Sequence, residues 1–201
     1  GWGTGFFINS NGYIITNHHV VENCEQALIY PNLTNESAIA NKIKDNKIND
    51  LAILKINKPS PMYLSISKNK PLLGTDIIVG GFPTPENLGI SIKITKGIIS
   101  GSDTRFEFLD IIDAAIQQGS SGSPVINSSG NIIGVAVGTQ IDQKDNNEQT
   151  LNYIVNWNSL KKFLKNSYIN YSVDNYDKSL STVDLAKQLE RTAVTIMCLG
   201  K

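Results

Sequence analysis

Hydrophobic residues occur in many short runs along the chain, with Gly, Asn or Pro between the runs. The first series is GFFIN, GYIIT, QALIY, ESAIANKI and LAILKI, and the second is DIIVGGF, ISIKITKGIIS, FLDIID, SPVIN, NIIGVAVG and TLNYIVN. Short runs separated by turn residues are typical of the strands of sandwiches and barrels. The segment NKPSP at 57–61 divides the two series. The pattern therefore predicts an all-β protein built from two barrels, with a tight hairpin at SNG, residues 10–12.

The pattern changes after Asn156, where apolar residues follow a helical period and predict a helix over residues 157–167. The polar segment 168–180 is predicted to be a linker. The segment 181–201 opens with a capping-box pattern, from Ser181 to Asp184, and predicts a second helix and a last strand. The apolar face of the first helix consists of Trp157, Leu160, Phe163 and Leu164.

Composition indicates a globular chain, because 40% of its 201 residues are hydrophobic and 18% are charged. Lys plus Arg and Asp plus Glu both number 18, so no basic excess points to nucleic acid. No apolar run approaches the length of a membrane span. We expect no metal or cofactor, because no ligand cluster is evident. The two cysteines, Cys24 and Cys198, are too few for a disulfide scaffold, and Cys24 is interpreted as a thiol without a catalytic role.

The stretch QGSSGSPV at 118–125 holds a serine, Ser121, among turn residues. A serine hydroxyl becomes a nucleophile only beside a base that a carboxylate orients. The chain has only two histidines, His18 and His19, at the end of the predicted strand GYIIT. Adjacent residues of an extended chain point in opposite directions, so we expect at most one of them to face a given cleft. Asp50 precedes the apolar run LAILKI, whereas the competing acid Asp45 precedes none.

The order His, Asp, Ser, with the serine in GSSGSP, resembles the trypsin-like serine peptidases, most closely their HtrA/Deg branch. The segments GTGFFINSNGYIITNHHVV, NDLAILKI, KITKGIIS, DAAIQQGSSGSPVINSSGNIIGV and LNYIVN follow in that family's order, over roughly residues 3–166. The resemblance implies a chymotrypsin-like fold of two six-stranded antiparallel β-barrels, with helices near the C-terminal end. It also implies a serine endopeptidase that hydrolyses peptide bonds through an acyl-enzyme.

The resemblance assigns roles to three side chains: His19 is the base, Asp50 orients it, and Ser121 attacks. The backbone N–H groups of Gly119 and Ser121 are expected to form the oxyanion hole. His18 is interpreted as a packing or solvent histidine. The sequence departs from the family's GNSGGP at Ser120 and at Ser123, and the side chain at 123 predicts crowding behind the nucleophile.

A primary specificity pocket is also implied, and it lacks an acidic residue at its base, so we expect cleavage after small or medium aliphatic residues. The polypeptide substrate would bind as an added strand. Asp113 is expected to hold backbone near the active-site loop. The implied pocket residues are Ala115, Ile116, Gln118, Val137, Gly138, Thr139 and Leu151.

The first series of runs is one strand short of six, and the segment 181–201 resembles the helix and strand that precede GTGFF in the family. We therefore predict that residues 193–199 form the first strand of barrel one and that the chain is circularly permuted. Two alternatives stay open: a strand swap that joins copies of the chain, or the start of a second protease domain. The expected division is 1–70 for the N-terminal barrel, 71–156 for the C-terminal barrel, 157–167 helix, 168–180 linker and 181–201 for the completing segment.

Two other functions compete with the endopeptidase. The first is a catalytically silent peptide-binding module on a protease fold, and the second is a chaperone-like holdase, which rests on family analogy alone. The family analogy also suggests a bacterial periplasmic or secreted protein.

Overall fold

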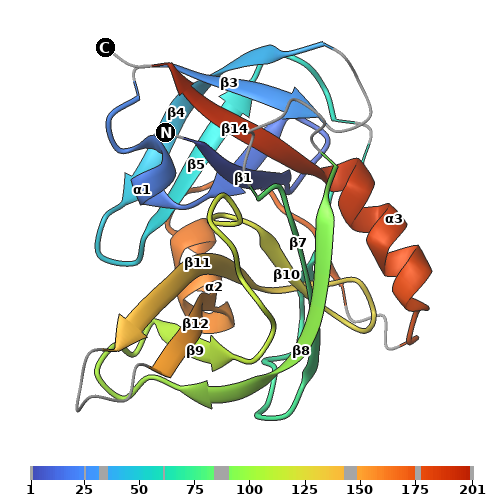
Figure 1. The fold of residues 1–201 in the computed structure, drawn as a ribbon. Helices are drawn as coiled ribbons and strands as arrows, with labels where there is room; N and C mark the ends of the chain where they lie inside the picture. Colours follow the sequence, from blue (N-terminus) through green and yellow to red (C-terminus); the bar gives the residue numbers. More distant parts are fainter. Residues whose placement is uncertain are drawn as a thin grey trace.

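The computed structural model describes residues 2–24, 26–31, 36–60, 62–83, 91–142, 149–174 and 178–199, without the side chains of 139–142 and 149–150. Two β-barrels lie one above the other, with helix α3 along one side (Figure 1). None of the described helices is long and apolar enough to cross a membrane.

Barrel one is closed by six antiparallel strands in the order β1-β14-β3-β4-β5-β2. Its hairpin at 10–12 forms as the sequence predicted, because Gly12 adopts a φ of 80° where a Cβ would overlap the Lys58 carbonyl. The strands are β1 (Trp2–Phe7), β2 (Tyr13–Thr16), β3 (Gln26–Pro31), β4 (Ala38–Asn46), β5 (Leu51–Ile56) and β14 (Ala193–Leu199).

Barrel two follows the order β10-β7-β8-β9-β12-β11, and pairing of β10 with β11 closes it. Both barrels thus have the six antiparallel strands of a chymotrypsin-like fold. Two short strands extend the sheet beyond β11, and they are β6 (Ile66–Ser67) and β13 (Val173–Asp174). The six barrel strands are β7 (Asp76–Gly81), β8 (Lys93–Ser102), β9 (Leu109–Ile112), β10 (Pro124–Asn127), β11 (Ile132–Asp142) and β12 (Gln149–Asn156).

Buried aliphatic residues fill both barrels and the space between them. One cluster lies inside barrel one, around Ile14, Ile29 and Ile196, and a second lies inside barrel two, around Val125 and Ile154. The third and largest cluster joins residues of both barrels with those of the helices. This interface core fixes the barrels against each other, so residues from both can build one site.

Both helices that the sequence predicted are present, and each begins at a side-chain cap. Asn156 accepts the Ser159 N–H at the start of α2 (Trp157–Lys165), and Ser181 accepts the Asp184 N–H at the start of α3 (Thr182–Thr192). Within the predicted linker, β13 pairs in parallel with β6.

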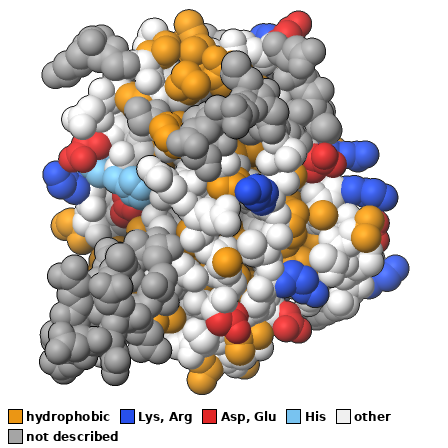
Figure 2. Space-filling view, in the orientation of Figure 1, with side chains coloured by type: hydrophobic (Ala, Val, Ile, Leu, Met, Phe, Trp, Pro, Cys, Tyr) orange, Lys and Arg blue, Asp and Glu red, His pale blue; other side chains and the backbone are white. Residues whose placement is uncertain are grey.

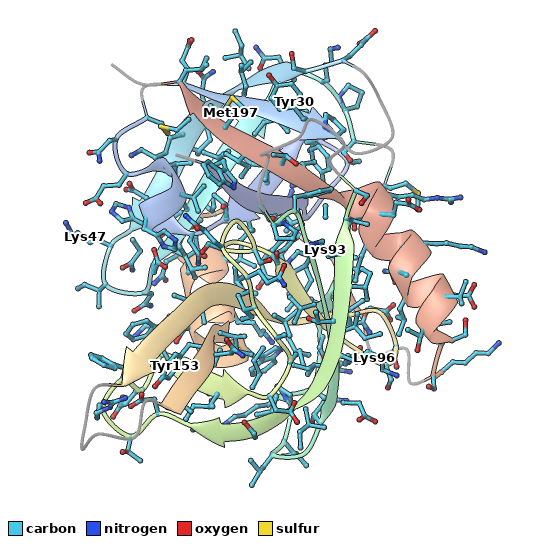
Figure 3. All side chains as sticks on the ribbon, in the orientation of Figure 1. Tyr30, Lys47, Lys93, Lys96, Tyr153 and Met197 are labelled. Atoms are coloured by element: carbon cyan, nitrogen blue, oxygen red, sulfur yellow. A yellow bond between two sulfur atoms is a disulfide. The ribbon has the colours of Figure 1, made fainter. Side chains whose placement is uncertain are left out.

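The C-terminal segment contacts both barrels. Leu189 of α3 packs against Gly80 of β7, and Lys96 of β8 donates to Thr182 (3.2 Å, Figure 3). β14 then enters barrel one between β1 and β3, which confirms the prediction for residues 193–199. Here the strand completes its own chain's barrel.

Cys24 and Cys198 form a disulfide, which corrects the interpretation of Cys24 as a free thiol. Their Cα atoms lie 5.4 Å apart because β14 runs beside β3, with Cys198 opposite Ala27. The bond ties the C-terminal strand to the loop that follows α1 (His18–Val21). The two cysteines are 174 residues apart in the sequence, so sequence analysis did not predict this pairing.

Candidate active site

His19 and Asp50 meet at the edge of barrel one. The Nδ1 atom of His19 lies 2.7 Å from Oδ2 of Asp50, and Oδ1 of Asp50 accepts the backbone N–H of His19 at 2.9 Å. An ionised carboxylate can only accept, so Nδ1 carries a proton, and in the neutral ring Nε2 keeps its lone pair. The backbone of Asp50 is also fixed, because its carbonyl accepts a hydrogen bond from the side-chain amide of Asn17 (2.9 Å).

The two histidines lie on the short helix α1, and not on the strand that the sequence predicted. Successive side chains of a helix point about 100° apart, so the histidines still diverge. His18 is buried, with Nδ1 3.1 Å from Asp45 and Nε2 3.5 Å from Glu22. The side chain of His19 is 46% exposed, and histidine atoms reach the surface beside acidic ones in Figure 2.

Charge pairs surround His18. A hydrogen bond from Lys42, with a smaller contribution from His18, holds the pKa of Asp45 below its usual value. Lys47, labelled in Figure 3, lowers the pKa of Glu22 in the same way, through a 2.9 Å hydrogen bond. These contacts hold His18 against Asp45 and Glu22 and leave His19 as the more exposed of the two histidines.

Ser121 lies on the loop between β9 and β10, and its hydroxyl donates to the Val137 carbonyl at 2.8 Å. Among the described residues the hydroxyl makes no other hydrogen bond, and it is not hydrogen-bonded to His19. Gly138 leaves room beside the hydroxyl, because a Cβ at that position would lie 3.4 Å from Oγ. The backbone of Ser121 is fixed from barrel one, where the Thr4 N–H donates to the Ser121 carbonyl (2.8 Å).

The backbone of this loop presents two unpaired donors. Within the described part of the chain, the N–H groups of Gly119 and Ser121 have no acceptor. Gly119 adopts a φ of 89°, which turns the loop before the serine. Three other N–H groups of the loop donate to carbonyls: Ser120 to Gln117, Gly122 to Ala136 and Ser123 to Ser120 (3.0, 2.8 and 3.0 Å).

The predicted crowding at Ser123 is relieved by Gly81, the last residue of β7. Ser123 is fully buried, and its hydroxyl occupies the place where a Cβ on Gly81 would project. Among the described residues this hydroxyl has no hydrogen-bond partner. The serine at 123 therefore depends on glycine at 81, which the sequence pattern did not reveal.

The residues of the expected specificity pocket lie on the serine loop and on paired strands. Gly138 of β11 pairs with Tyr153 of β12, and Leu151 pairs with Gln140. Ile116 is 7% exposed and packs in the barrel-two core, while Ala115 and Gln118 are exposed. The side chain of Thr139 lies outside the described part. Asp113 holds backbone, as expected, by accepting the Ile98 N–H at 2.6 Å.

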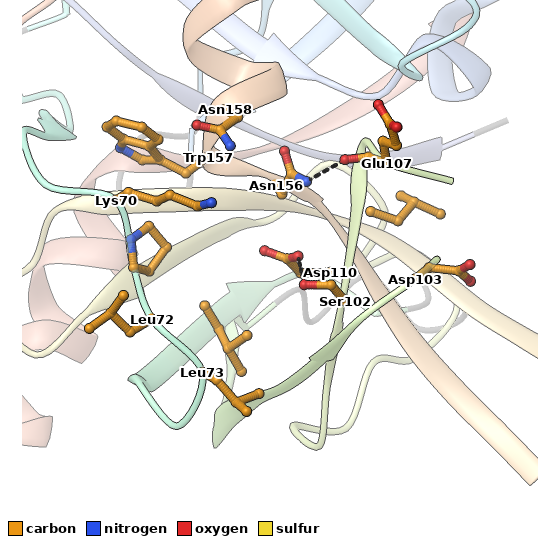
Figure 4. Close-up of a pocket in the computed structure, with 13 residues that line it drawn as sticks. Lys70, Leu72, Leu73, Ser102, Asp103, Glu107, Asp110, Asn156, Trp157 and Asn158 are labelled. Carbon is orange, nitrogen blue, oxygen red and sulfur yellow. Dashed lines mark hydrogen bonds between the residues drawn. The ribbon is translucent and has the colours of Figure 1, made fainter. Parts of the chain in front are cut away.

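A cavity of about 430 Å³ opens on barrel two, lined by Leu72, Leu73 and Trp157 with Asp110 and Glu107 (Figure 4). None of the three catalytic candidates lines it. The described residues contain no group of three or more His, Cys, Asp or Glu side chains arranged to hold a metal ion.

Beside this cavity, the Arg105 guanidinium donates to buried Asp103 at 2.8 Å. It thereby holds the pKa of that carboxyl far below its usual value.

Comparison with known proteins identifies a family that matches most of the chain. Residues 3–135 match the family model of the trypsin-like peptidase domain. The chain is 36% identical, over 66% of its length, to a probable periplasmic serine endoprotease, DegP-like, of Chlamydia trachomatis. It is 31% identical, over 98% of its length, to the uncharacterized protein y4bJ of Sinorhizobium fredii. The chain spans 27% and 32% of these two relatives.

Two solved structures share the fold. A serine endoprotease from Yersinia pestis superimposes with a TM-score of 0.67 and 26% identity, over 82% of this chain and 57% of that one. The HtrA-type protease AlgW, solved with a decapeptide, superimposes with a TM-score of 0.66 and 23% identity, over 82% and 51%.

Proposed function

Because the chain belongs to the trypsin-like peptidase family, we propose that it is the catalytic region of a serine endopeptidase, with Ser121, His19 and Asp50 as its triad. The observation that carries the proposal is the pair of bonds from Asp50 to His19. They fix both the ring orientation and the tautomer, and they leave the Nε2 lone pair available as a base.

In the proposed reaction the Ser121 hydroxyl turns from the Val137 carbonyl to Nε2 of His19. Oγ attacks the substrate carbonyl carbon, and its proton passes to Nε2. The resulting oxyanion accepts the N–H groups of Gly119 and Ser121. Nε2 then returns the proton to the leaving amine, and water hydrolyses the acyl-enzyme by the same steps. Asp50 stays ionised throughout and stabilises the imidazolium.

The substrate is an extended polypeptide cleaved after a small or medium aliphatic residue. Val137, Gly138 and Leu151 supply an apolar lining without a carboxylate, so a lysine or arginine side chain would lose hydration without gaining a partner. The peptide would bind as an added strand, pairing its backbone with that of the protein near the serine.

An oxidising compartment fits the disulfide between Cys24 and Cys198, since such bonds persist mainly outside the reducing cytosol. This supports the periplasm, in agreement with the names of the DegP-like relatives.

The test is labelling with a fluorophosphonate together with a peptide library varied at the residue before the cleaved bond. We expect the wild type to react, and Ser121→Ala to lose labelling and about 10⁴- to 10⁶-fold of its turnover. The library should show a preference for Val, Ala or Leu. Labelling that persists in Ser121→Ala would place the nucleophile elsewhere, and a preference for Arg or Lys would overturn the pocket assignment.

The competing function, a silent peptide-binding module, is favoured by one observation: the Ser121 hydroxyl is bonded to Val137 and not to His19. Unbound active sites often have loose catalytic hydrogen bonds, so this geometry does not decide against the enzyme. A folded wild type that binds peptides but never labels would establish the module.

A further inference from the structure

Thr4 of β1 lies at the junction of the two barrels and is fully buried. Its N–H, its carbonyl and its hydroxyl are all hydrogen-bonded, and three of the four bonds cross to barrel two. The N–H donates to the Ser121 carbonyl (2.8 Å), Oγ1 donates to the Gly119 carbonyl (2.9 Å) and accepts the Phe82 N–H (3.0 Å), and the carbonyl accepts the Thr16 hydroxyl (2.7 Å).

These contacts fix two peptide planes of the serine loop. In the Gly119–Ser120 plane, the carbonyl accepts the Thr4 hydroxyl and the N–H donates to the Gln117 carbonyl. In the Ser121–Gly122 plane, the carbonyl accepts the Thr4 N–H and the N–H donates to the Ala136 carbonyl. Each plane is thus held at both ends.

The two unpaired N–H groups belong to the planes that flank the Gly119–Ser120 plane. The N–H of Gly119 belongs to the plane before it, and the N–H of Ser121 to the plane after it. The central plane joins the planes of both donors, and any change in its orientation requires loss of the Thr4 hydroxyl bond. A hydroxyl from barrel one therefore anchors the backbone between the two donors.

We propose that Thr4 is a positioning residue that holds the oxyanion donors of Gly119 and Ser121 toward the substrate carbonyl. The proposal rests on the proposed function, because it assigns Thr4 a role in the same reaction. Only a hydroxyl fits, since one atom must donate to the Gly119 carbonyl and accept from Phe82. Serine retains both bonds, whereas valine has the shape of threonine and neither bond.

The test compares Thr4→Val, Thr4→Ser and the wild type on a peptide substrate, with fluorophosphonate labelling run to completion to count folded sites. We expect Thr4→Val to lower kcat about 10- to 100-fold with KM within about twofold, because donors aimed at the oxyanion act mainly in the transition state. Thr4→Ser should keep kcat within about threefold of the wild type.

The matched control is Thr192→Val, which removes another buried hydroxyl that donates to a carbonyl, that of Gln188 (2.8 Å), on α3. It should lower the melting temperature and leave kcat unchanged. A kcat for Thr4→Val within threefold of the wild type, or a Thr4→Ser as slow as Thr4→Val, would overturn the proposal.

If Thr4→Val does not fold, Thr4→Ala replaces it, and failure of both would show that Thr4 serves only the fold. A wild type without Ser121-dependent labelling would instead refute the proposed function itself, before Thr4 is considered.

Discussion

At the scale of single residues, each of two adjacent histidines has its own carboxylate. The sequence predicted Asp50 as the partner of the catalytic histidine, with Asp45 as the competing acid. The structure pairs Asp45 with His18 and Asp50 with His19. The reason is the short helix α1, which turns the two side chains toward β4 and toward the residue before β5. The two pairs provide a natural matched control.

We expect Asp50→Asn to lower kcat about 10⁴-fold, because an amide at that position no longer fixes the tautomer that leaves Nε2 unprotonated. Asp45→Asn should keep kcat within about threefold, since Asp45 contacts His18 and not His19. The measurement is kcat on a peptide substrate, with circular dichroism to confirm folding. Equal losses in the two variants would contradict the assignment of Asp50.

The Asp45 pair also gives the direction of a pH effect on stability. The folded-state pKa of Asp45 is lowered, so its stabilisation is present above the unfolded-state pKa and is lost as the pH falls through the folded value. Asp103, held by Arg105, follows the same direction in more acidic solution.

At the scale of elements, β14 is the strand that closes barrel one, between β1 and β3. Val194 and Ile196 are at most 1% exposed, and burial of each such side chain contributes about 1.5–3 kcal/mol. The sequence predicted this strand from the missing sixth member of the barrel. It did not predict the disulfide, because the two cysteines become neighbours only when β14 pairs with β3.

We expect Cys24→Ser with Cys198→Ser to lower the free energy of unfolding by about 2–5 kcal/mol, because the bond constrains the unfolded chain. For a chain of this size that corresponds to roughly 5–15 °C in Tm. Thermal unfolding with and without dithiothreitol checks this. The reductant should lower the wild-type Tm to that of the double variant and leave the variant unchanged; an unaffected wild type would argue against the bond.

At the scale of the whole molecule, the C-terminal segment joins the barrels. α3 packs on barrel two, where Gln188 donates to the Gly130 carbonyl (3.1 Å), and β14 belongs to barrel one. Trp2 is paired with Met197, so the first strand in the chain lies beside the last. This arrangement supports the hypothesis of circular permutation.

We expect a rearranged chain, with residues 178–201 moved ahead of residue 1, to fold and to keep kcat/KM within about threefold. The reason is that β14 and β1 are already neighbours, so the same strands would pair in the same order. Activity and melting temperature check this, with a chain that lacks 178–201 as the control. That control should not fold stably.

Light scattering at several concentrations should show the same mass for the parent and the rearranged chain. A parent whose mass rises with concentration while the rearranged chain stays monomeric would indicate a strand swap instead.

The sequence by itself determined the all-β class, the six-stranded barrels, the Ser181 cap of α3 and the three catalytic candidates. These follow from local information, namely short apolar runs, turn residues, capping patterns and a motif order that resembles one family. The resemblance also located the missing strand in residues 193–199.

Tertiary structure alone decided the contacts between distant segments: the disulfide, the pairing of His18 with Asp45, the space that Gly81 gives Ser123, and the bonds from Thr4 to the serine loop. Each depends on residues tens or more positions apart that meet only when strands pair and barrels pack. Sequence spacing carries no signal for such meetings, because the register of long-range pairing is set by burial of the whole core.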